Sequence, residues 1–422
     1  MSPKQFKSIK GTHDILPEIS WKWRQLEYFL HDFMSHYGYR EIRTPVFEET
    51  ELFSRSVGED TDIVSKEMYS WTDQGGVNLT LKPEVTAPVV RSFIQHNLSG
   101  VNPNTKVYYW DALFRRDRPQ KGRWRQFHQF GVESFGSAFP EQDGEVIIMA
   151  YQFFKKLGLT EFILKLNSIG YSECRNFYRT ALTEYLKPYF SDLSETSQKR
   201  FQSNPLRILD TKVPHEKEIL NDAPNIVNYL SAEDVTHFEE VQALLKTNNI
   251  PFELDTQMVR GLDYYTRTTF EITSNLLGAQ NALCGGGRYD HLVEKLGGKP
   301  MPAVGFAAGI ERILLALEHV QTGWKPLTTN VYIICLDEES RSAGFTIAEE
   351  LREKGISTET DLLRRSLRSQ MREANRTGVK LAVIIGEKEL QSQKIQVKDL
   401  HKGEQSEIKR KSLIDHIVHL NL

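Results

Sequence analysis

Two β-rich runs, residues 105–115 and 125–134, flank a polar loop and set the first limit on how this chain can fold. Runs of this kind, bounded by turn residues, predict an antiparallel strand pair. Side chains alternate between the two faces of a strand. One face of the second run carries Arg125, Phe127, Gln129, Gly131 and Glu133, and the other carries Gln126, His128, Phe130 and Val132. A sheet surface that only covers a core is apolar throughout, so the ring, amide and carboxylate on the first face predict a ligand surface.

The length of this polar face suits an extended ligand. Residues 127 and 133 lie about 20 Å apart along a strand, which fits a nucleotide joined to an amino acid. Phe127 can stack on a base, Gln129 can contact a polar group, and Glu133 can bind a donor at the far end. Basic residues fill the loop: Arg115, Arg116, Arg118, Lys121 and Arg123. Guanidinium groups bind phosphate oxygens. A solvated basic loop would explain the arginines alone, but the polar face beside them favours an ATP site.

The composition excludes several classes of protein. A chain of 422 residues is long enough for two or three domains, and a net charge of −3 gives no overall basic surface for nucleic acid. The three cysteines, Cys174, Cys284 and Cys335, form no C-x-x-C pair, so we expect no metal site, no disulfide framework and a reducing cytoplasm. No apolar run suggests a signal peptide or a membrane span. A P-loop pattern is also absent from the sequence.

Periodicity predicts a first domain over residues 1–325 with a helical insertion at 173–251. Helices are expected at 18–37, 143–157, 173–201, 231–249 and 309–319, and strands at 253–259, 268–274 and 302–308. The segment YREIRTPVFEETELF reads as extended, and its Pro45 favours an edge or interface position because proline cannot donate to a strand ladder.

A second domain is predicted over residues 326–422, where strands and helices alternate in a mainly parallel α/β pattern. Its strands are expected at 330–336, 356–360 and 380–385, and its helices at 339–354 and 362–376. The second helix presents a basic face of Arg365, Arg368, Arg372 and Arg376 near Arg364, opposite Leu363, Leu367 and Met371. A solvated face and a contact with an anionic partner explain this pattern about equally well.

Four further segments carry polar residues suited to a site. Glu84 and Thr86 lie two residues apart, so in extended chain they point the same way and can hold an ammonium group. The segment at 259–272 contains Arg260, Asp263, Tyr264, Tyr265 and Arg267. The segment LCGGGRYDHL places Arg288 and Tyr289 after three glycines that let the backbone approach a ligand. Arg312, in the first turn of a helix, opposes the helix dipole and suggests an anion site. Read singly, the first three segments could be a strand end or turns.

Taken together and in order, these segments resemble the histidyl-tRNA synthetases, a family of class II aminoacyl-tRNA synthetases. FRRDRPQKGRWRQFHQFGVE resembles the second motif of the class, AVGFAAGIERIL the third, and the helix with TPVFEETELF the first. RGLDYYTRTTFE and CGGGRYD resemble the two histidine-specific motifs, and KGTHDILP the family's start. The resemblance implies an antiparallel sheet of six to seven strands with helices, a helical insertion and a C-terminal α/β anticodon-binding domain.

The resemblance also implies roles for individual residues. Arg115, Arg260 and Arg312 would be catalytic; Arg115, Asp117, Arg123, Phe127 and Arg312 would bind ATP. Glu84, Thr86, Gln129, Glu133, Tyr265 and Tyr289 would bind histidine, and Gln120, Arg364 and Arg368 would contact tRNA. The chain departs from the family at Arg116-Asp117, where His-Glu is common, and at Lys82, where arginine is common.

The implied reaction is ATP-dependent activation of histidine to histidyl-adenylate, followed by transfer to the 3′ end of tRNA-His, with Mg²⁺ as cofactor and no editing domain. A cytoplasmic homodimer is expected, without a membrane partner. The alternatives are a non-catalytic synthetase-like regulator of histidine biosynthesis, which would lose catalytic arginines and the anticodon domain, and a sensor of uncharged tRNA within a kinase.

Overall fold

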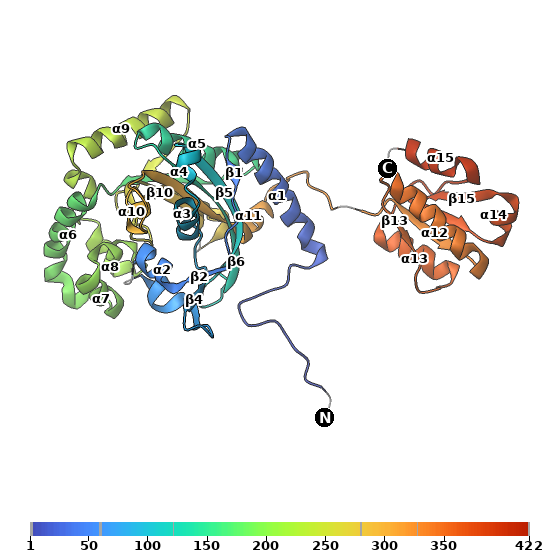
Figure 1. Cartoon of the computed structure of the whole chain (residues 1–422), viewed down its shortest axis with the longest axis horizontal. Coiled ribbons are helices and arrows are strands. Elements are labelled where there is room, and N and C mark those ends of the chain that lie inside the picture. The colour runs from blue at the N-terminus through green and yellow to red at the C-terminus, as the bar shows by residue number, and fades with distance from the viewer. Residues whose placement is uncertain (1–2, 59–60, 121, 279–280, 327, 421–422) are drawn as a thin grey trace. The chain divides into compact units, whose positions relative to one another are not determined.

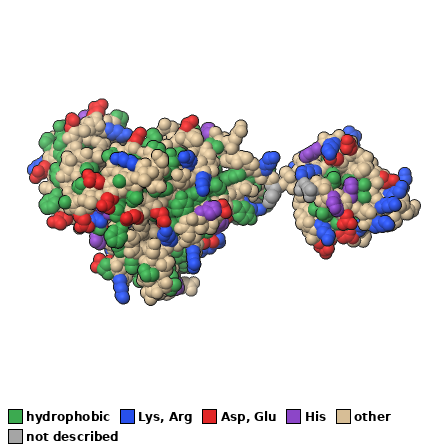
Figure 2. Space-filling view, turned by 90° about the horizontal axis from the view of Figure 1, so that it is seen from above, with side chains coloured by type: hydrophobic (Ala, Val, Ile, Leu, Met, Phe, Trp, Pro, Cys, Tyr) green, Lys and Arg blue, Asp and Glu red, His purple; other side chains and the backbone are tan. Residues whose placement is uncertain are grey.

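The computed structural model describes residues 3–58, 61–120, 122–278, 281–326 and 328–420. The chain folds as two compact units, Met1–Trp324 and Lys325–Leu422, which are described separately (Figure 1). In the space-filling view, acidic and basic side chains are interspersed over the visible face of each unit (Figure 2). None of the helices within the described ranges has the length and hydropathy needed to cross a membrane.

The first unit is built on a sheet with the strand order β1-β5-β6-β11-β10-β9-β7-β8. These strands are β1 (Arg40–Glu41), β5 (Thr105–Phe114), β6 (Gln126–Phe135), β7 (Ile163–Ser168), β8 (Glu253–Leu254), β9 (Thr266–Thr273), β10 (Ala282–Arg288) and β11 (Ala303–Gly309). The six inner strands pair antiparallel, and only the two-residue edge strands β1 and β8 pair parallel. The predicted antiparallel sheet and its β5–β6 hairpin are therefore confirmed.

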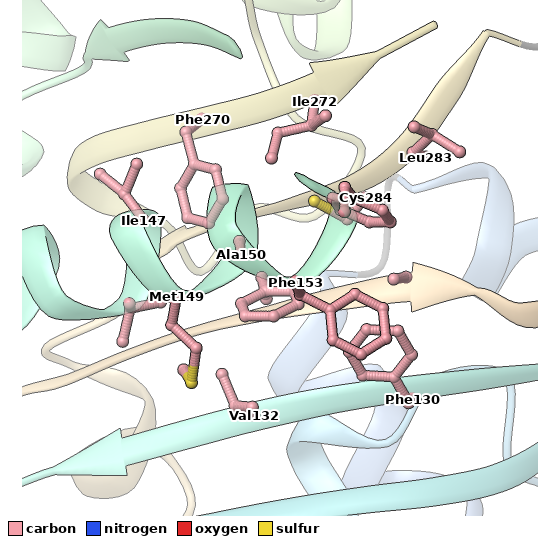
Figure 3. Packing of buried hydrophobic residues seen from close by; sticks show 14 of the residues in the cluster. Phe130, Val132, Ile147, Met149, Ala150, Phe153, Phe270, Ile272, Leu283 and Cys284 are labelled. Carbon is pink, nitrogen blue, oxygen red and sulfur yellow. The ribbon is translucent and has the colours of Figure 1, made fainter. Parts of the chain in front are cut away.

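Four helices cover one face of this sheet and form the main core. They are α1 (Pro17–His36), α5 (Pro140–Lys156), α9 (Ala232–Thr247) and α11 (Ile310–Leu317). Figure 3 shows Phe153 of α5 between the sheet residues Phe130 and Phe270, with Phe130 and Phe153 ring centroids 4.6 Å apart. Each such buried ring contributes roughly 1.5–3 kcal/mol to folding. The even-numbered residues of β6 thus face this core, as predicted from the alternation.

The opposite face of the sheet is only partly covered, which leaves room for a site. It packs against α3 (Thr86–Gln95) and α10 (Leu292–Lys295), with Phe93 and Phe135 stacked at 4.3 Å. Beside them lie α2 (Thr50–Val57), the short helices η1 (Ile63–Glu67) and α4 (Leu98–Val101), and a three-stranded sheet of β2 (Phe47–Glu49), β4 (Asn78–Leu81) and β3 (Tyr69–Thr72).

The segment predicted as extended around Pro45 is only partly so. Pro45 lies between β1 and β2, and Thr50 already begins α2. The helix forms because Phe53 and Val57, four residues apart, are both fully buried on one face. The prediction of one extended segment was wrong, because the segment contains an extended part and, from Thr50, a helix.

Two strands of the large sheet were missed and one was predicted too long. β7 was not predicted, and β10, whose glycines were expected to form a turn or a close backbone approach to a ligand, is a central strand. Glycines are disfavoured in strands unless another group needs their space, which only tertiary structure can show. The strand expected at 253–259 is limited to Glu253–Leu254 at the sheet edge.

The helical insertion has its own small core. It contains α6 (Ser172–Leu186), η2 (Lys187–Asp192), α7 (Glu195–Ser203), η3 (Pro205–Asp210), α8 (Pro214–Leu220) and η4 (Ile226–Tyr229), followed by α9. Tyr178, Leu182 and Leu186 line the buried side of α6 at helical spacing. The helix predicted over 173–201 is broken because Pro188 lies in the first turn of a 3₁₀ segment and Ser194 caps a new helix.

The second unit is a sheet of strand order β13-β12-β14-β15-β16 with helices packed on it. Its elements are β12 (Val331–Cys335), α12 (Glu338–Glu353), β13 (Thr358–Thr360), α13 (Leu367–Thr377), β14 (Leu381–Ile385), α14 (Glu387–Ser392), β15 (Lys394–Asp399), β16 (Gln405–Lys409), η6 (Arg410–Ser412) and α15 (Leu413–His419). The three predicted strands pair parallel, but β14, β15 and β16 pair antiparallel, so the sheet is mixed rather than mainly parallel.

Candidate active site

A cavity of about 440 Å³ opens on the less covered face of the large sheet. Its walls come from β6, β9, β10 and β11, from the start of α3 and from the loop that joins β5 to β6. Every predicted ATP- or histidine-binding residue lines it: Glu84, Thr86, Arg115, Asp117, Arg123, Phe127, Gln129, Glu133, Arg260, Tyr265, Tyr289 and Arg312. Residues separated by up to 228 positions are thus brought together, from Glu84 to Arg312 (312 − 84).

One end of the cavity is built around the buried carboxylate of Glu133. The Thr86 hydroxyl donates to its Oε1 at 2.8 Å, and the Tyr289 hydroxyl donates to its Oε2. Burial raises the pKa of Glu133 to about 8, although both hydroxyl donors lower it. Gly305 lies directly beneath this carboxylate, where a Cβ would collide with Oε2. The arrangement holds one acceptor group rigidly in a water-poor pocket.

Glu84 supplies a second carboxylate near this end. Its Oε1 accepts from the Ala87 backbone N–H at 3.0 Å, whereas its Oε2 is buried without a partner among the described residues. Burial raises its pKa to about 7. An unpartnered buried oxygen is costly, so this end of the cavity is suited to an incoming cation such as an ammonium group.

Glu84 and Thr86 do not point the same way along a strand, as the sequence had suggested. Thr86 is the first residue of α3, and Glu84 folds back to accept from its first turn. The expectation that both line one site still agrees with the structure, but the cause is a helix start with a carboxylate beside its N-terminal amides.

The other end of the cavity is positively charged. Arg115 lies over the Phe127 ring at 5.2 Å and its Nε donates to the Pro83 carbonyl at 2.8 Å. Arg312 donates from Nη1 to the Ala282 carbonyl at 3.0 Å. Burial, reinforced by Arg123 and Arg115, lowers the pKa of Arg312. Guanidinium groups that repel one another in a buried site favour a multiply charged anion.

Arg260 reaches the cavity between the two ends and is paired with Glu271. Its guanidinium lies directly over Gly285, where a Cβ would occupy the same space. The glycines of β10 were expected to admit a ligand to the backbone. The structure corrects this for Gly285, which makes room for an arginine side chain, and for Gly286, which lies against the Gly305 carbonyl.

Several polar residues singled out in the sequence have structural partners instead. Arg288 is fully buried and pairs with Asp143 and Asp290. Arg267 pairs with Asp234 at 2.7 Å, outside the cavity.

The two departures from the family pattern also have local explanations. Lys82 is fully buried against Asp111 and donates to the Thr44 carbonyl at 3.1 Å, so it holds strands together. Asp117 pairs with Arg123 inside the cavity, where Glu67 lies 3.6 Å from the same guanidinium.

Some cavity residues were not predicted. Tyr109, Tyr264, Glu271, Asp210 and Lys212 line it as well. Tyr264 stood in a segment already noted for its tyrosines, whereas Asp210 and Lys212 come from the insertion, and no local pattern joins them to the sheet.

The predicted tRNA-contacting residues lie elsewhere. Gln120 is exposed in the β5–β6 loop, and Lys121 falls outside the described residues. In the second unit the helix starts at Leu367, not at 362, so Arg364, with φ 52°, and Arg365 precede it. Arg365 pairs with Asp361 at 2.5 Å, and this ion pair stabilises the turn that precedes α13.

The basic face of that helix is accordingly smaller than predicted. Arg368 and Arg372 are exposed on α13, whereas Arg376 pairs with Glu373 at 2.5 Å. The leucines expected to form the opposite, apolar stripe are exposed, and the buried residues are Gln370 and Ala374.

Comparisons with known proteins identify the family of the chain. A family model described as histidyl-tRNA synthetase matches residues 11–313, and an anticodon binding domain model matches residues 330–420. The chain is 47% identical to the histidine–tRNA ligase of Natranaerobius thermophilus, covering 97% of this chain and 98% of that one. It is 49% identical to the histidine–tRNA ligase of Chloroherpeton thalassium, covering 96% of each.

Solved structures give the same result. The fold is similar to that of apo histidyl-tRNA synthetase from S. aureus, with a TM-score of 0.82 and 37% identity over 98% of this chain and 100% of that one. A structure from Bacillus halodurans titled as an ATP phosphoribosyltransferase regulatory subunit/histidyl-tRNA synthetase, at 23% identity and a TM-score of 0.66, shares the fold. The site, the identity of 47% and 49% over nearly the full length, and the two matched family models lead to one conclusion: this chain belongs to the histidyl-tRNA synthetase family.

Proposed function

We propose that the cavity binds ATP at its arginine-rich end and histidine at its Glu133 end, and joins them in the first step of tRNA charging. The chain is a histidine–tRNA ligase by family, so its substrates are ATP, histidine and tRNA-His. The observation that supports the residue roles is the order of side chains on β6. Phe127, Gln129 and Glu133 line one cavity in sequence order, with arginines at the first end and the buried carboxylate at the other.

In the activation step, a carboxylate oxygen of histidine attacks the α-phosphorus of ATP. A new C–O–P bond forms, the bond to the bridging oxygen breaks, and pyrophosphate leaves with the electron pair. Arg115 and Arg260 stabilise the charge that develops on the α-phosphate, and Arg312 holds the γ-phosphate. Phe127 stacks on the adenine. Positioning and charge stabilisation are sufficient for this chemistry, and no side-chain nucleophile is required.

Selectivity for histidine follows from the partners at the Glu133 end. A neutral imidazole has one N–H donor and one acceptor nitrogen. Glu133 accepts from the donor, and the Tyr265 hydroxyl donates to the acceptor, while Tyr289 donates to Glu133 and holds it in place. Glu84, Thr86 and Gln129 hold the amino group. A competitor that lacks either ring nitrogen leaves these buried groups unpaired, and such sites can discriminate by about 10⁴ without editing.

The second step transfers the histidyl group to tRNA. A ribose hydroxyl at the tRNA 3′ end attacks the adenylate carbonyl, an ester bond forms, and AMP leaves. In this proposal Gln120, exposed in the β5–β6 loop, contacts the acceptor end, and Arg364 and Arg368, exposed in the second unit, contact the anticodon arm.

Mg²⁺ fits the arginine-rich end as a cofactor. The ion is usually held by one or two carboxylates together with substrate phosphates. Glu271 and Glu311 line the cavity and would hold the ion there, Glu271 beside its partner Arg260 and Glu311 beside His128. When bound, the ion would neutralise phosphate charge.

A homodimer is supported by an apolar patch on the three-stranded sheet. Val46, Phe47, Trp71 and Val77 are each more than 40% exposed. Phe47 and Trp71 are in edge-to-face contact at 5.9 Å. Exposed aromatic side chains in contact with each other mark an interaction site, and a second copy of this chain is the occupant that the family's first motif implies. The three free cysteines accord with a cytoplasmic location.

A synthetase-like regulator without catalysis is not favoured. Arg115, Arg260 and Arg312 all line the cavity, and the chain contains the anticodon-binding domain. Three partly buried arginines at one cavity suit the stabilisation of charge on a reacting phosphate.

Histidine-dependent exchange of pyrophosphate into ATP tests the proposal. The chain should catalyse it with histidine and not with other amino acids. Glu133→Gln should lower kcat/KM for histidine by roughly 10²-fold or more, because a charged hydrogen bond is lost and an amide faces two hydroxyl donors. Glu294→Gln, the same change at an exposed position, should leave exchange unchanged. Near-normal histidine exchange in Glu133→Gln would remove Glu133 from the histidine site.

A further inference from the structure

A second cavity, of about 320 Å³, lies between α6, η3 and the loop that precedes β9. We call it the α6 cavity. The loop residues Val259, Arg260, Leu262 and Tyr265 line both this cavity and the active-site cavity. This loop therefore separates the two cavities.

The walls of the α6 cavity are strongly basic. Arg175 and Arg179 project from α6 and Arg207 from η3, and Arg260 contributes from the shared loop. Asp263 is the only carboxylate among the described residues that line it. Arg260 is neutralised by Glu271, so an excess of positive charge remains on the insertion side.

Some N–H donors of these arginines have no hydrogen-bond partner within the described part of the chain. The buried Nε atoms of Arg175 and Arg207 have no partner there. Arg207 donates to the Gly261 carbonyl at 3.0 Å and to Asp263 at 3.3 Å. Arg179 donates to the Ser203 carbonyl at 2.9 Å, and no described carboxylate lies within 4.0 Å of Arg175 or Arg179. Buried guanidinium N–H groups without partners are costly, and an anion would satisfy several at once.

The geometry of α6 favours the same class of ligand. Ser172, Arg175, Asn176 and Arg179 have the spacing of one helix face, and all four line the cavity. Ser172 is the first residue of this 15-residue helix, whose N-terminal end attracts negative charge. Burial also lowers the pKa of Arg175, as expected for a cation that has lost water without gaining a full set of partners.

We propose that the α6 cavity binds a phosphate group through Arg175, Arg179 and Arg207. Two sources share this chemistry. One is a backbone phosphate of the tRNA acceptor strand, whose terminal ribose must enter the adjoining active site. The other is free phosphate or pyrophosphate. The tRNA source rests on the proposed tRNA-charging function; the phosphate site itself does not.

The test uses the full chain and the double variant Arg175→Gln/Arg179→Gln. Its matched control is Lys187→Gln/Lys199→Gln, which removes two charges from exposed positions of the same insertion. Three measurements are made on each: KM for transcribed tRNA-His in aminoacylation at several salt concentrations, histidine-dependent pyrophosphate exchange without tRNA, and calorimetric binding of inorganic phosphate and of pyrophosphate.

If the ligand is a tRNA phosphate, the double variant should raise KM for tRNA roughly tenfold and flatten its salt dependence by about one unit of log slope. Pyrophosphate exchange should stay within about twofold of the parent protein, because Arg175 and Arg179 lie outside the active-site cavity. If the ligand is a free anion, KM for tRNA should be unchanged while calorimetric binding of phosphate or pyrophosphate is lost.

A double variant that matches its control in all three measurements overturns the proposal. If the double variant does not fold, Asn176→Glu replaces it, since this exposed position lines the cavity and the added carboxylate should repel the phosphate. A parent protein that binds phosphate at this cavity but charges no tRNA would contradict the proposed function and leave the site standing.

Discussion

At the scale of single residues, the unusual feature is a pair of buried carboxylates, Glu84 and Glu133, beside each other in one pocket. Burial raises the pKa of Glu84 to about 7 and that of Glu133 to about 8, and the charge of Glu84 adds to the rise at Glu133. Raised folded-state pKa values mean that the ligand-free protein is stabilised by protonation. This stability is complete below the ordinary pKa of 4.5 and is lost as pH rises through about 7 and 8.

Bound histidine should favour the ionised form of both carboxylates, because its ammonium group and ring N–H need ionised partners. We expect KM for histidine to fall roughly threefold to tenfold between about pH 7 and pH 8.5, a range in which the free imidazole is already neutral. Thermal stabilisation by histidine should also be larger at the higher pH. Both are measured by pyrophosphate exchange and by melting curves. A KM that does not change with pH would show that these carboxylates are already ionised.

Tyr289→Phe gives an independent check of the same carboxylate. The Tyr289 hydroxyl donates to Glu133 and lowers its pKa. Without this donor the pKa of Glu133 should rise further, and the KM profile should move to higher pH. The readout is the position of the profile, which a general loss of stability would not shift. A profile that stays in place while KM rises uniformly would mean that Tyr289 acts only through packing.

At the scale of elements, β10 shows how one strand can serve two tasks through adjacent glycines. A Cβ at Gly285 would meet the Arg260 guanidinium, the movable end of a side chain, whereas a Cβ at Gly286 would meet the Gly305 backbone in β11. Neither φ lies in the left-handed region, so the difference between them is one of neighbours rather than of backbone strain.

Gly285→Ala and Gly286→Ala should therefore fail in different ways. Gly285→Ala should displace Arg260 and lower kcat of exchange by roughly 10²-fold, the scale expected when one charge-stabilising donor is misplaced. Its melting temperature should stay close to that of the parent. Gly286→Ala should push β10 from β11 and lower the melting temperature by several degrees, about 1–3 kcal/mol of overpacking. Equal loss of stability in both variants would contradict this assignment of the two glycines.

At the scale of the whole molecule, each unit has cores of its own, so removal of residues 325–422 should leave the first unit folded. We expect the truncated chain to retain histidine-dependent pyrophosphate exchange within about threefold, because every predicted active-site residue lies in the first unit. Aminoacylation of tRNA should fall by at least about 10²-fold as anticodon contacts are lost. Loss of exchange on truncation would show that the second unit supports the active site directly.

The proposed dimer is tested on the apolar patch of the three-stranded sheet. Trp71→Glu places a charge at its centre and should convert the dimer to a monomer in sedimentation analysis. Phe177→Glu, which introduces the same charge at another exposed aromatic residue, is the control and should leave the mass unchanged. A parent protein that sediments as a monomer would contradict the dimer proposal.

The site could be predicted largely because its residues are concentrated in motifs. The alternation on β6 placed Phe127, Gln129 and Glu133 on one face, and the structure has all three in the cavity. The errors came where a residue's role depends on a distant neighbour. Arg288 looked like a site residue until Asp143, 145 positions away, was seen to pair with it.

The sequence by itself determined the two-unit plan, the antiparallel hairpin, the helical insertion and the family, because periodicity and motif order are properties of local chain segments. Only the tertiary structure decided that LCGGGRYDHL contains a central strand, that Glu84 caps a helix start, and that Arg175, Arg179 and Arg207 share a cavity with the back of the Arg260 loop. The physical reason is the same in each case. Burial, steric space and charge pairing depend on residues far apart in the sequence, and the pattern within a short segment does not show which distant residues will contact it.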